Sequence, residues 1–269
     1  METHRELADQ LHTAERDVRP VGALTDRWPD LTVEDAYAIQ QLNIDRRVAG
    51  GARVLGRKVG LTSAPMQEML GVDEPDYGVL LDDMFVEEGD DVPLERLIAP
   101  RVEAEIAFVM GADLAGPGVS SVAALRAIAG ALPALEIIDS RVADWKITLA
   151  DTVADNASSG MVALGARITP IDGLDLRLLG MAISRNGVAV DSGAGAAVLG
   201  HPARCVAWLA NRLAPFGASL RAGDVILAGA LHRAIPVVHG DVVRAELAHL
   251  GAVTARFADA TTDPEGAHA

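Results

Sequence analysis

The chain is organised around one segment, Arg101-Val-Glu-Ala-Glu-Ile-Ala-Phe-Val-Met110, in which apolar residues alternate with two glutamates. Such alternation is typical of a β-strand, because successive side chains point to opposite faces of the sheet. Glu103 and Glu105 would therefore emerge on one face, while the apolar residues on either side of them pack on the other. A third glutamate, Glu136, lies in a second strand-like run, Ala134-Leu-Glu-Ile-Ile-Asp139.

Three carboxylates in apolar strands predict a metal site. Like charges buried together are costly without a counter-ion, whereas a hard divalent cation such as Mg²⁺ accepts oxygen ligands. The alternative is a solvated edge strand that carries two outward glutamates, with an unrelated third. Glu136, flanked by leucine and isoleucine, favours the metal site.

Further short apolar segments, separated by Gly, Asp and Asn turns, predict a strand-rich body around this strand. Asn186-Gly187 predicts a type I′ hairpin. Helices are expected at 119–131 and at 202–216. The further strands are expected at 134–140, 160–165, 177–184, 224–229, 241–247 and 252–258.

The first 50 or so residues are predicted to be mostly helical. One is expected at 1–18 and another at 32–50, which Thr32 would cap and glycines would end. A strand at 53–59 and a short helix at 64–70 follow. Helices followed by a strand-rich body favour an α+β fold over an alternating parallel one.

The expected organisation has three parts. Residues 1–75 form a mostly helical N-terminal region that contributes Lys58, residues 76–260 a strand-rich catalytic domain, and residues 261–269 a flexible tail.

Composition narrows the class of protein. Half of the 269 residues are hydrophobic, enough for a core, and the net charge of −15 without a basic stripe argues against nucleic acid and anionic membranes as partners. A membrane-spanning run and a signal-peptide layout are both absent from the sequence, so a cytoplasmic protein is expected. Cys205 is the only cysteine, which excludes an intrachain disulfide and predicts a core residue of a helix.

Three segments are candidates for chemistry. The chain has only two lysines, and nearly all its other basic residues are arginines. Lys58 is therefore a candidate, because a lysine can titrate when its surroundings shift its pKa, whereas an arginine stays protonated. Asp76 follows in a Pro-Gly turn at 73–78, and the intervening helix could bring the two residues together. A polar segment at 151–160, with Asn156 and Ser158, would otherwise be an ordinary loop. The glycines near 193 lack the spacing of a dinucleotide fingerprint, which argues against a nucleotide cofactor.

Six motifs in order resemble the 2-hydroxypenta-2,4-dienoate hydratases (2-keto-4-pentenoate hydratases), relatives of fumarylacetoacetate hydrolase that act in meta-cleavage breakdown of aromatic compounds. The resemblance runs from about residue 34 to residue 258. It implies a fumarylacetoacetase-type fold with a helical N-terminal region, Mg²⁺ or Mn²⁺ as cofactor, and a homo-oligomer, a pentamer or decamer, built from fivefold units. The motifs are Gly56-Arg-Lys-Val-Gly-Leu-Thr-Ser63, Leu70-Gly-Val-Asp-Glu-Pro-Asp-Tyr-Gly78, Pro100-Arg-Val-Glu-Ala-Glu-Ile-Ala107, Leu132-Pro-Ala-Leu-Glu136, Ala154-Asp-Asn-Ala-Ser-Ser-Gly160 and Leu199-Gly-His-Pro202.

The resemblance also assigns roles to residues. It makes Glu103, Glu105 and Glu136 the metal ligands, in agreement with the strand argument. Lys58 becomes the active-site lysine and Asp76 its acid/base partner.

Substrate contacts follow from the same resemblance. Ser158, with its neighbour Asn156, would hold the substrate carboxylate, and Leu61 would line the pocket for the substrate's tail. The chain departs from its relatives at Ala228-Gly-Ala-Leu-His-Arg233. His232 there is either a determinant of substrate preference or an exposed loop histidine.

The expected activity is hydration of 2-hydroxypenta-2,4-dienoate, or of a C5-substituted homologue, to a 4-hydroxy-2-oxo acid. In that reaction the metal would chelate the carboxylate and the C2 oxygen, C5 would be protonated, and water would add at C4. The first alternative is a 4-oxalocrotonate-type decarboxylase of the same superfamily, which would not need the carboxylate of Asp76 for water addition. A carbon–carbon hydrolase ranks third, because the third ligand is glutamate and no histidine neighbours the motifs. The different-class alternative, a non-catalytic protein that binds small acids, has no reason to retain Lys58 and Asp76 beside three glutamates.

Overall fold

The computed structural model describes residues 2–258, so the expected flexible tail at 261–269 lies outside the described residues. Helices and strands are both abundant, which confirms the α+β class. Within the described range no helix is long and apolar enough to cross a membrane. The α-helices are α1 (Glu2–Arg16), α2 (Leu24–Arg27), α3 (Val33–Ala49), α4 (Ala64–Leu70), α5 (Ser121–Ala127), α6 (Leu149–Ala154) and α7 (Ala203–Leu213).

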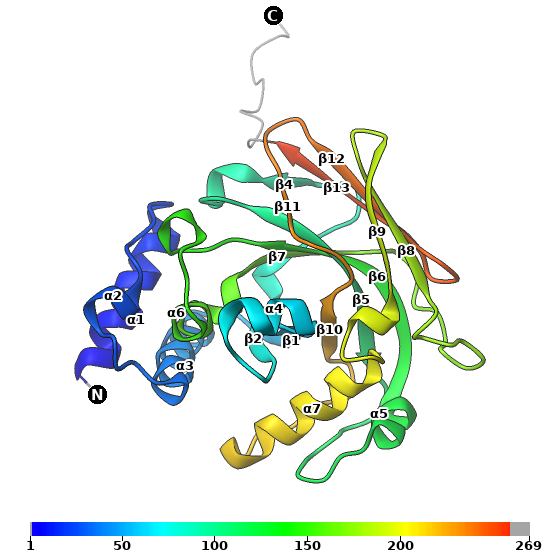
Figure 1. Cartoon of the computed structure of the whole chain (residues 1–269), viewed down its shortest axis with the longest axis horizontal. Coiled ribbons are helices and arrows are strands. Elements are labelled where there is room, and N and C mark those ends of the chain that lie inside the picture. Colours follow the sequence, from blue (N-terminus) through cyan, green and yellow to red (C-terminus); the bar gives the residue numbers. More distant parts are fainter. Residues whose placement is uncertain (1, 259–269) are drawn as a thin grey trace, which may run out of the picture.

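Four helices gather on one side of the molecule. Helix α3 packs against α1 and α6, and α2 also contacts α6 (Figure 1). Helix α3 begins where the sequence predicts, because the Thr32 hydroxyl accepts from the Asp35 N–H while the Asp35 carboxylate accepts from the Thr32 N–H. Helices α5 and α7 pack together at a different place on the molecule (Figure 1). Cys205 is a fully buried residue of α7, and burial raises the pKa of its thiol, which confirms the predicted core role.

The larger sheet has eight strands in the order β2-β1-β10-β5-β6-β7-β3, and β11 pairs with β5 beside this path. Its centre is the antiparallel pair β5 and β6, which is the most extensive contact between two elements. Strand β1, from the N-terminal side of the expected boundary at residue 75, pairs with both β2 and β10. The strands are β1 (Val54–Gly60), β2 (Asp76–Leu81), β3 (Phe85–Val86), β5 (Arg101–Met110), β6 (Ile128–Ile138), β7 (Ser159–Leu164), β10 (Val225–Ala230) and β11 (Ile235–Pro236).

Strand β5 has the bounds and the two faces predicted from its alternation. Its alternate apolar residues are fully buried in the main hydrophobic core, whereas Glu103 and Glu105 point away from that core. The side chains that pack in the core are Val102, Ala104, Ile106 and Phe108.

The smaller sheet has five strands in the order β4-β13-β12-β8-β9. The predicted type I′ hairpin joins two of them, and its Asn186 and Gly187 both have positive φ, 54° and 78°. The strands are β4 (Asp91–Pro93), β8 (Gly180–Arg185), β9 (Val188–Ala194), β12 (Val242–Leu247) and β13 (Gly251–Ala258).

The predicted helix at 119–131 is too long. The helix, α5, ends at Ala127, and β6 begins at Ile128, six residues earlier than predicted. The apolar run 128–132 suits either structure by local preference, and pairing with β5 decides for the strand, where Gly130 lies opposite Val109.

Two predicted loops are regular structure. The polar segment at 151–160 begins inside α6, whose first turn has a capping box between Thr148 and Asp151, and continues into a 3₁₀ turn, η4 (Asn156–Ser158). The predicted turn at 73–78 is shorter than expected, because Asp76 already starts β2. In both cases tertiary contacts to the sheet order residues whose polarity suggests a loop.

Candidate active site

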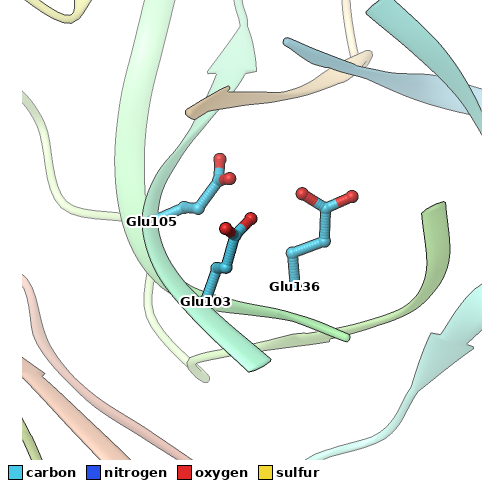
Figure 2. A group of neighbouring side chains, drawn as sticks. All are labelled: Glu103, Glu105 and Glu136. Carbon is cyan, nitrogen blue, oxygen red and sulfur yellow. The ribbon is translucent and has the colours of Figure 1, made fainter. Parts of the chain in front are cut away.

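Glu103, Glu105 and Glu136 form one cluster. Glu103 and Glu136 lie directly opposite each other on β5 and β6, and Glu105 follows on the same face of β5. The three carboxylate groups converge (Figure 2), and one oxygen from each lies within 4.8 Å of the others. The cluster predicted from two strands is therefore present as geometry.

Ionisation of all three glutamates is strongly unfavourable when no cation lies between them. Burial, together with the nearby charge of Glu136, raises the pKa of Glu103 to about 7 and the pKa of Glu105 well above its usual range. Glu105 accepts a hydrogen bond of 2.7 Å from the Gly229 N–H, but neither oxygen of Glu136 accepts one from the described residues. Buried oxygens without donors, next to two further carboxylates, could hold a divalent cation.

Lys58 points into the same cluster from β1. Its Nζ atom lies 3.4 Å from Oε1 of Glu136, and the two residues are 4 % and 0 % exposed. Burial lowers the pKa of Lys58, but Glu136, Asp76 and the two β5 glutamates together raise it above its usual range. The neighbouring carboxylates therefore favour the charged form of Lys58.

Asp76 lies beside Lys58 on the neighbouring strand. It is paired with Gly60 across the β1–β2 ladder, so the predicted approach of Lys58 and Asp76 is present. A Cβ atom at Gly60 would lie 2.2 Å from Oδ1 of Asp76 and 3.3 Å from Nζ of Lys58, so the missing side chain makes room for both groups. Burial raises the pKa of Asp76, and Lys58 opposes that shift.

Helix α3 holds the outer edge of β2, a contribution that sequence patterns did not reveal. The Tyr77 N–H donates to the Tyr37 hydroxyl, and Nε2 of Gln40 donates to the Tyr77 carbonyl. Tyr37 also stacks on Tyr77, with 4.5 Å between ring centroids. These contacts fix the strand that begins with Asp76. A buried glutamine on an apolar helix face was the only available signal.

The η4 turn continues this edge. The Asn156 side chain donates to the Val79 carbonyl and accepts from the Val79 N–H, so its amide takes the place of a neighbouring strand. The Ser158 hydroxyl lies 3.1 Å from the Thr152 hydroxyl and is buried. Leu61 directly follows β1 with a positive φ of 54°, and its carbonyl accepts from Gln67 of α4.

His232 is not the exposed loop histidine that the sequence suggested. Its side chain has no exposed surface, and Nε2 accepts a 2.8 Å hydrogen bond from the Ala104 N–H, between the two glutamates of β5. Burial lowers the pKa of His232, which favours the neutral ring that this acceptor role needs. A buried histidine therefore lies beside the glutamates of β5 in space, although it is distant from them in the sequence, and the expectation that no histidine neighbours the motifs is wrong.

The donor set fits a divalent cation. Four carboxylates act on one ammonium group, which leaves an excess of three negative charges when all are ionised. The donors Glu103, Glu105 and Glu136 offer only oxygen, which hard cations such as Mg²⁺ prefer to softer metals. Together with Lys58 and Asp76 they could hold a cation next to an amine and a carboxyl group, both of which can exchange protons.

Comparison with known proteins places the chain in a recognised group. The fumarylacetoacetate (FAA) hydrolase C-terminal family matches residues 49–258. A 2-keto-4-pentenoate hydratase of Paraburkholderia xenovorans (strain LB400) is 49 % identical over 254 residues, 94 % of each chain. A 2-oxo-hept-4-ene-1,7-dioate hydratase of Escherichia coli is 41 % identical over 261 residues, 95 % of this chain and 98 % of the relative.

A solved structure agrees with both findings. The 4-oxalocrotonate decarboxylase from Pseudomonas putida G7, complexed with magnesium and adipate, superposes with a TM-score of 0.92 at 42 % identity, over 95 % of this chain and 97 % of its own. The fold that the sequence resemblance implied is confirmed.

Proposed function

Because the chain belongs to the fumarylacetoacetate hydrolase family, among the 2-keto-4-pentenoate hydratases, we propose that it is a metal-dependent hydratase of 2-hydroxypenta-2,4-dienoate or a C5-substituted homologue. The product is a 4-hydroxy-2-oxo acid, and the reaction belongs to meta-cleavage breakdown of aromatic compounds. One observation carries the proposal: a buried lysine and a buried aspartate meet three converging glutamates.

Glu103, Glu105 and Glu136 hold the metal in this proposal, Mg²⁺ or Mn²⁺. The magnesium in the related decarboxylase structure and the all-oxygen donor set support this choice. When bound, such a cation supplies Lewis acidity toward the substrate's carboxylate and C2 oxygen.

Lys58 and Asp76 carry the proton chemistry. The ammonium group of Lys58 stabilises negative charge that develops on the C2 oxygen. Asp76 delivers a proton to C5 while the C2 hydroxyl releases its proton to solvent, which converts the dienol to a 2-oxo-3-enoate with an electrophilic C4. The carboxylate of Asp76 then takes a proton from the water that adds at C4, and the resulting enolate is protonated at C3 from solvent, which completes the hydration. Burial supports this role, because it raises the pKa of Asp76, and a carboxyl group with a raised pKa is a stronger proton acceptor than an exposed one.

Substrate binding falls to the residues around this pair. Ser158 holds the substrate carboxylate with backbone groups of the η4 turn. Asn156 takes part through the turn itself, because its side-chain amide is engaged with Val79. Leu61, at the end of β1, lines the pocket for the substrate's tail.

Decarboxylation is the second candidate, and the 0.92 TM-score to a 4-oxalocrotonate decarboxylase is the observation that favours it. Both reactions need a cation at the C2 oxygen, whereas water addition also needs a group that moves protons to carbon. The buried Asp76 therefore supports hydration.

The decisive experiment compares two substrates. Purified protein is assayed with 2-hydroxypenta-2,4-dienoate and with 2-oxohex-3-enedioate, each with Mg²⁺ and with EDTA. A hydroxy-oxo acid from the first substrate, formed only with the metal, is the expected result. Release of CO₂ from the second with no turnover of the first would establish the decarboxylase instead. Absence of metal-dependent turnover on both would favour a binding protein.

The proposed enzyme is a cytoplasmic homo-oligomer, a pentamer or decamer, without nucleic-acid or membrane partners. The family's assembly supports the oligomer. Light scattering of the purified protein tests it, and the 28.1 kDa mass of a single chain is the contradicting result.

A further inference from the structure

The η4 turn has an unusual backbone. Asn156, Ala157 and Ser158 have φ values of 53°, 52° and 53°, so three consecutive non-glycine residues are left-handed. L-residues avoid this region because Cβ approaches the following carbonyl oxygen, and single residues rather than runs normally adopt it. Strained backbone persists only where surrounding contacts impose it, and such positions are found preferentially at functional sites.

Arg141 supplies those contacts. Its guanidinium donates from Nη2 to the Asp155 carbonyl (2.6 Å) and from Nη1 to the Ser159 carbonyl (3.0 Å), the residues directly before and after the turn. Its Nε donates to Oδ1 of Asp155, and its backbone N–H donates to Oδ2. One side chain therefore holds both ends of the left-handed segment.

The Arg141–Asp155 pair is buried, with the two residues 6 % and 4 % exposed. Replacing a buried ion pair by apolar residues is often neutral or stabilising, so stability alone is a weak reason for its presence. Each donor of this arginine that touches the turn meets a specific oxygen, as a planar fork of donors can do and an ammonium group cannot. The geometry is that of a clamp.

The clamped turn lies directly against β2, the strand that begins with Asp76. A Cβ at Gly78 would lie 2.5 Å from the Asn156 carbonyl oxygen, and Gly78 is the ladder partner of Lys58. The Asn156 side chain pairs with Val79, three residues after Asp76. On its other side, the Ser158 carbonyl accepts from the Asp139 N–H, three residues after Glu136. The turn thus bridges the strand of Asp76 to the strand of Glu136.

We propose that Arg141 and Asp155 are positioning residues that hold the left-handed turn 156–158 in place, so that Ser158 meets the substrate and β2 keeps Asp76 in register. The role in catalysis rests on the proposed function. The clamp itself does not, and it is testable without turnover.

The variant Arg141→Lys keeps the charge and loses the fork. Arg47→Met is the matched control: Arg47 lines the same small pocket, of about 30 Å³, as Arg141 and Asp155, but its ion pairs are with Glu15 and Asp83. Hydrogen exchange is measured for two backbone amides. The Ser158 N–H donates to the Asp155 carbonyl, and the Asp139 N–H donates to the Ser158 carbonyl. We expect exchange at least about tenfold faster in Arg141→Lys and unchanged in the control. Wild-type exchange in a folded Arg141→Lys protein would overturn the clamp.

Kinetics with 2-hydroxypenta-2,4-dienoate and Mg²⁺ test the consequence. Arg141→Lys should raise KM by about 10- to 100-fold, because small misplacements of binding groups have effects of that order, while the Mg²⁺ dissociation constant of the EDTA-treated protein stays within about twofold. Unchanged KM and kcat despite faster exchange, or an equal KM change in Arg47→Met, would overturn the positioning role. If wild-type protein does not turn over this substrate, the proposed function fails, and the exchange result still decides the clamp.

A second substitution separates positioning from a general loss of packing. Glycine adopts left-handed φ freely. Ala157→Gly should therefore reverse part of the rise in KM that Arg141→Lys causes, when the two substitutions are combined. A folded double variant with no recovery of KM would contradict the proposal that Arg141 acts by holding this conformation.

Discussion

Nζ of Lys58 lies 3.4 Å from Oε1 of Glu136, and both side chains are buried. The lysine is thus paired with a glutamate whose two buried oxygens accept no hydrogen bond from the rest of the described chain. The pair joins the proposed metal site to the proposed proton-transfer groups, because Asp76 lies beside Lys58 over Gly60. A change at either end is therefore expected to affect the other.

Glu105→Gln should weaken Mg²⁺ binding and abolish activity. The amide keeps an acceptor for the Gly229 N–H but removes one metal ligand, so the loss of affinity should exceed the ~10- to 100-fold typical of a group that only supports a ligand. The metal-free variant should be more stable than wild type, because like-charge crowding is relieved. Calorimetric titration and thermal melts measure both effects, and wild-type turnover without added metal would place the metal site elsewhere.

Mg²⁺ should stabilise the EDTA-treated protein. A ligand that binds only the native state at 100 times its dissociation constant adds about 2.7 kcal/mol, which corresponds to a rise in Tm of about 5–10 °C for a chain of this size. Differential scanning calorimetry measures the rise. Glu105→Gln is the control and should show no shift, and an unchanged wild-type Tm would count against the assignment.

Asp76→Asn should lower kcat by about 10²- to 10⁴-fold, the usual contribution of general acid/base catalysis. KM should change little, because chelation by the metal supplies most of the binding and the amide has the same shape. If Asp76 only ordered the start of β2, kcat would stay near normal and Tm would fall. Measuring kcat, KM and Tm on one preparation distinguishes these outcomes.

The metal-free protein should lose stability as pH rises from about 4.5 to 7. In the folded state the pKa of Glu103 is about 7, against about 4.3 in an unfolded chain, so in this range the folded state binds more protons. Its contribution to the free energy of unfolding is therefore full below about pH 4.3 and is lost as pH rises through 7. Mg²⁺ affinity should rise over the same range, because the ligand must be deprotonated. Melts of EDTA-treated protein test this, and Glu103→Gln should flatten the dependence.

Gly60→Ala should inactivate the protein without unfolding it. The new Cβ would lie 2.2 Å from the Asp76 carboxylate, which must move away from Lys58, so kcat should fall by about the same factor as for Asp76→Asn. Gly180→Ala is the matched control on β8, where no atom lies within 4 Å of the added Cβ. Equal kcat for the two variants would contradict the proposed position of Asp76.

The site was predictable where it depends on period and order along one strand. The alternation in β5 placed Glu103 and Glu105 on one face, and the apolar run around Glu136 predicted a second strand, which the structure pairs with β5. Where competing local preferences were equal, prediction failed. The composition of residues 128–131 predicts a continuation of α5, but these residues pair with β5 as a strand. The composition of residues 151–158 predicts a loop, but they form the end of a capped helix and a left-handed turn.

His232 and Arg141 show why the remainder could not be predicted. His232 reaches the Ala104 amide across 128 residues, and Arg141 reaches Asp155 across 14. Neither sequence separation corresponds to the repeat of a helix or a strand, so local structure does not predict these contacts. The burial that affects the pKa of His232 and of Arg141 exists only once the sheet is assembled. The sequence alone determined the α+β class, the faces of β5 and the identity of the charged groups, since these follow from backbone geometry and side-chain chemistry. Only the tertiary structure decided which charges meet and what each pKa becomes, because both depend on the water excluded when distant segments pack together.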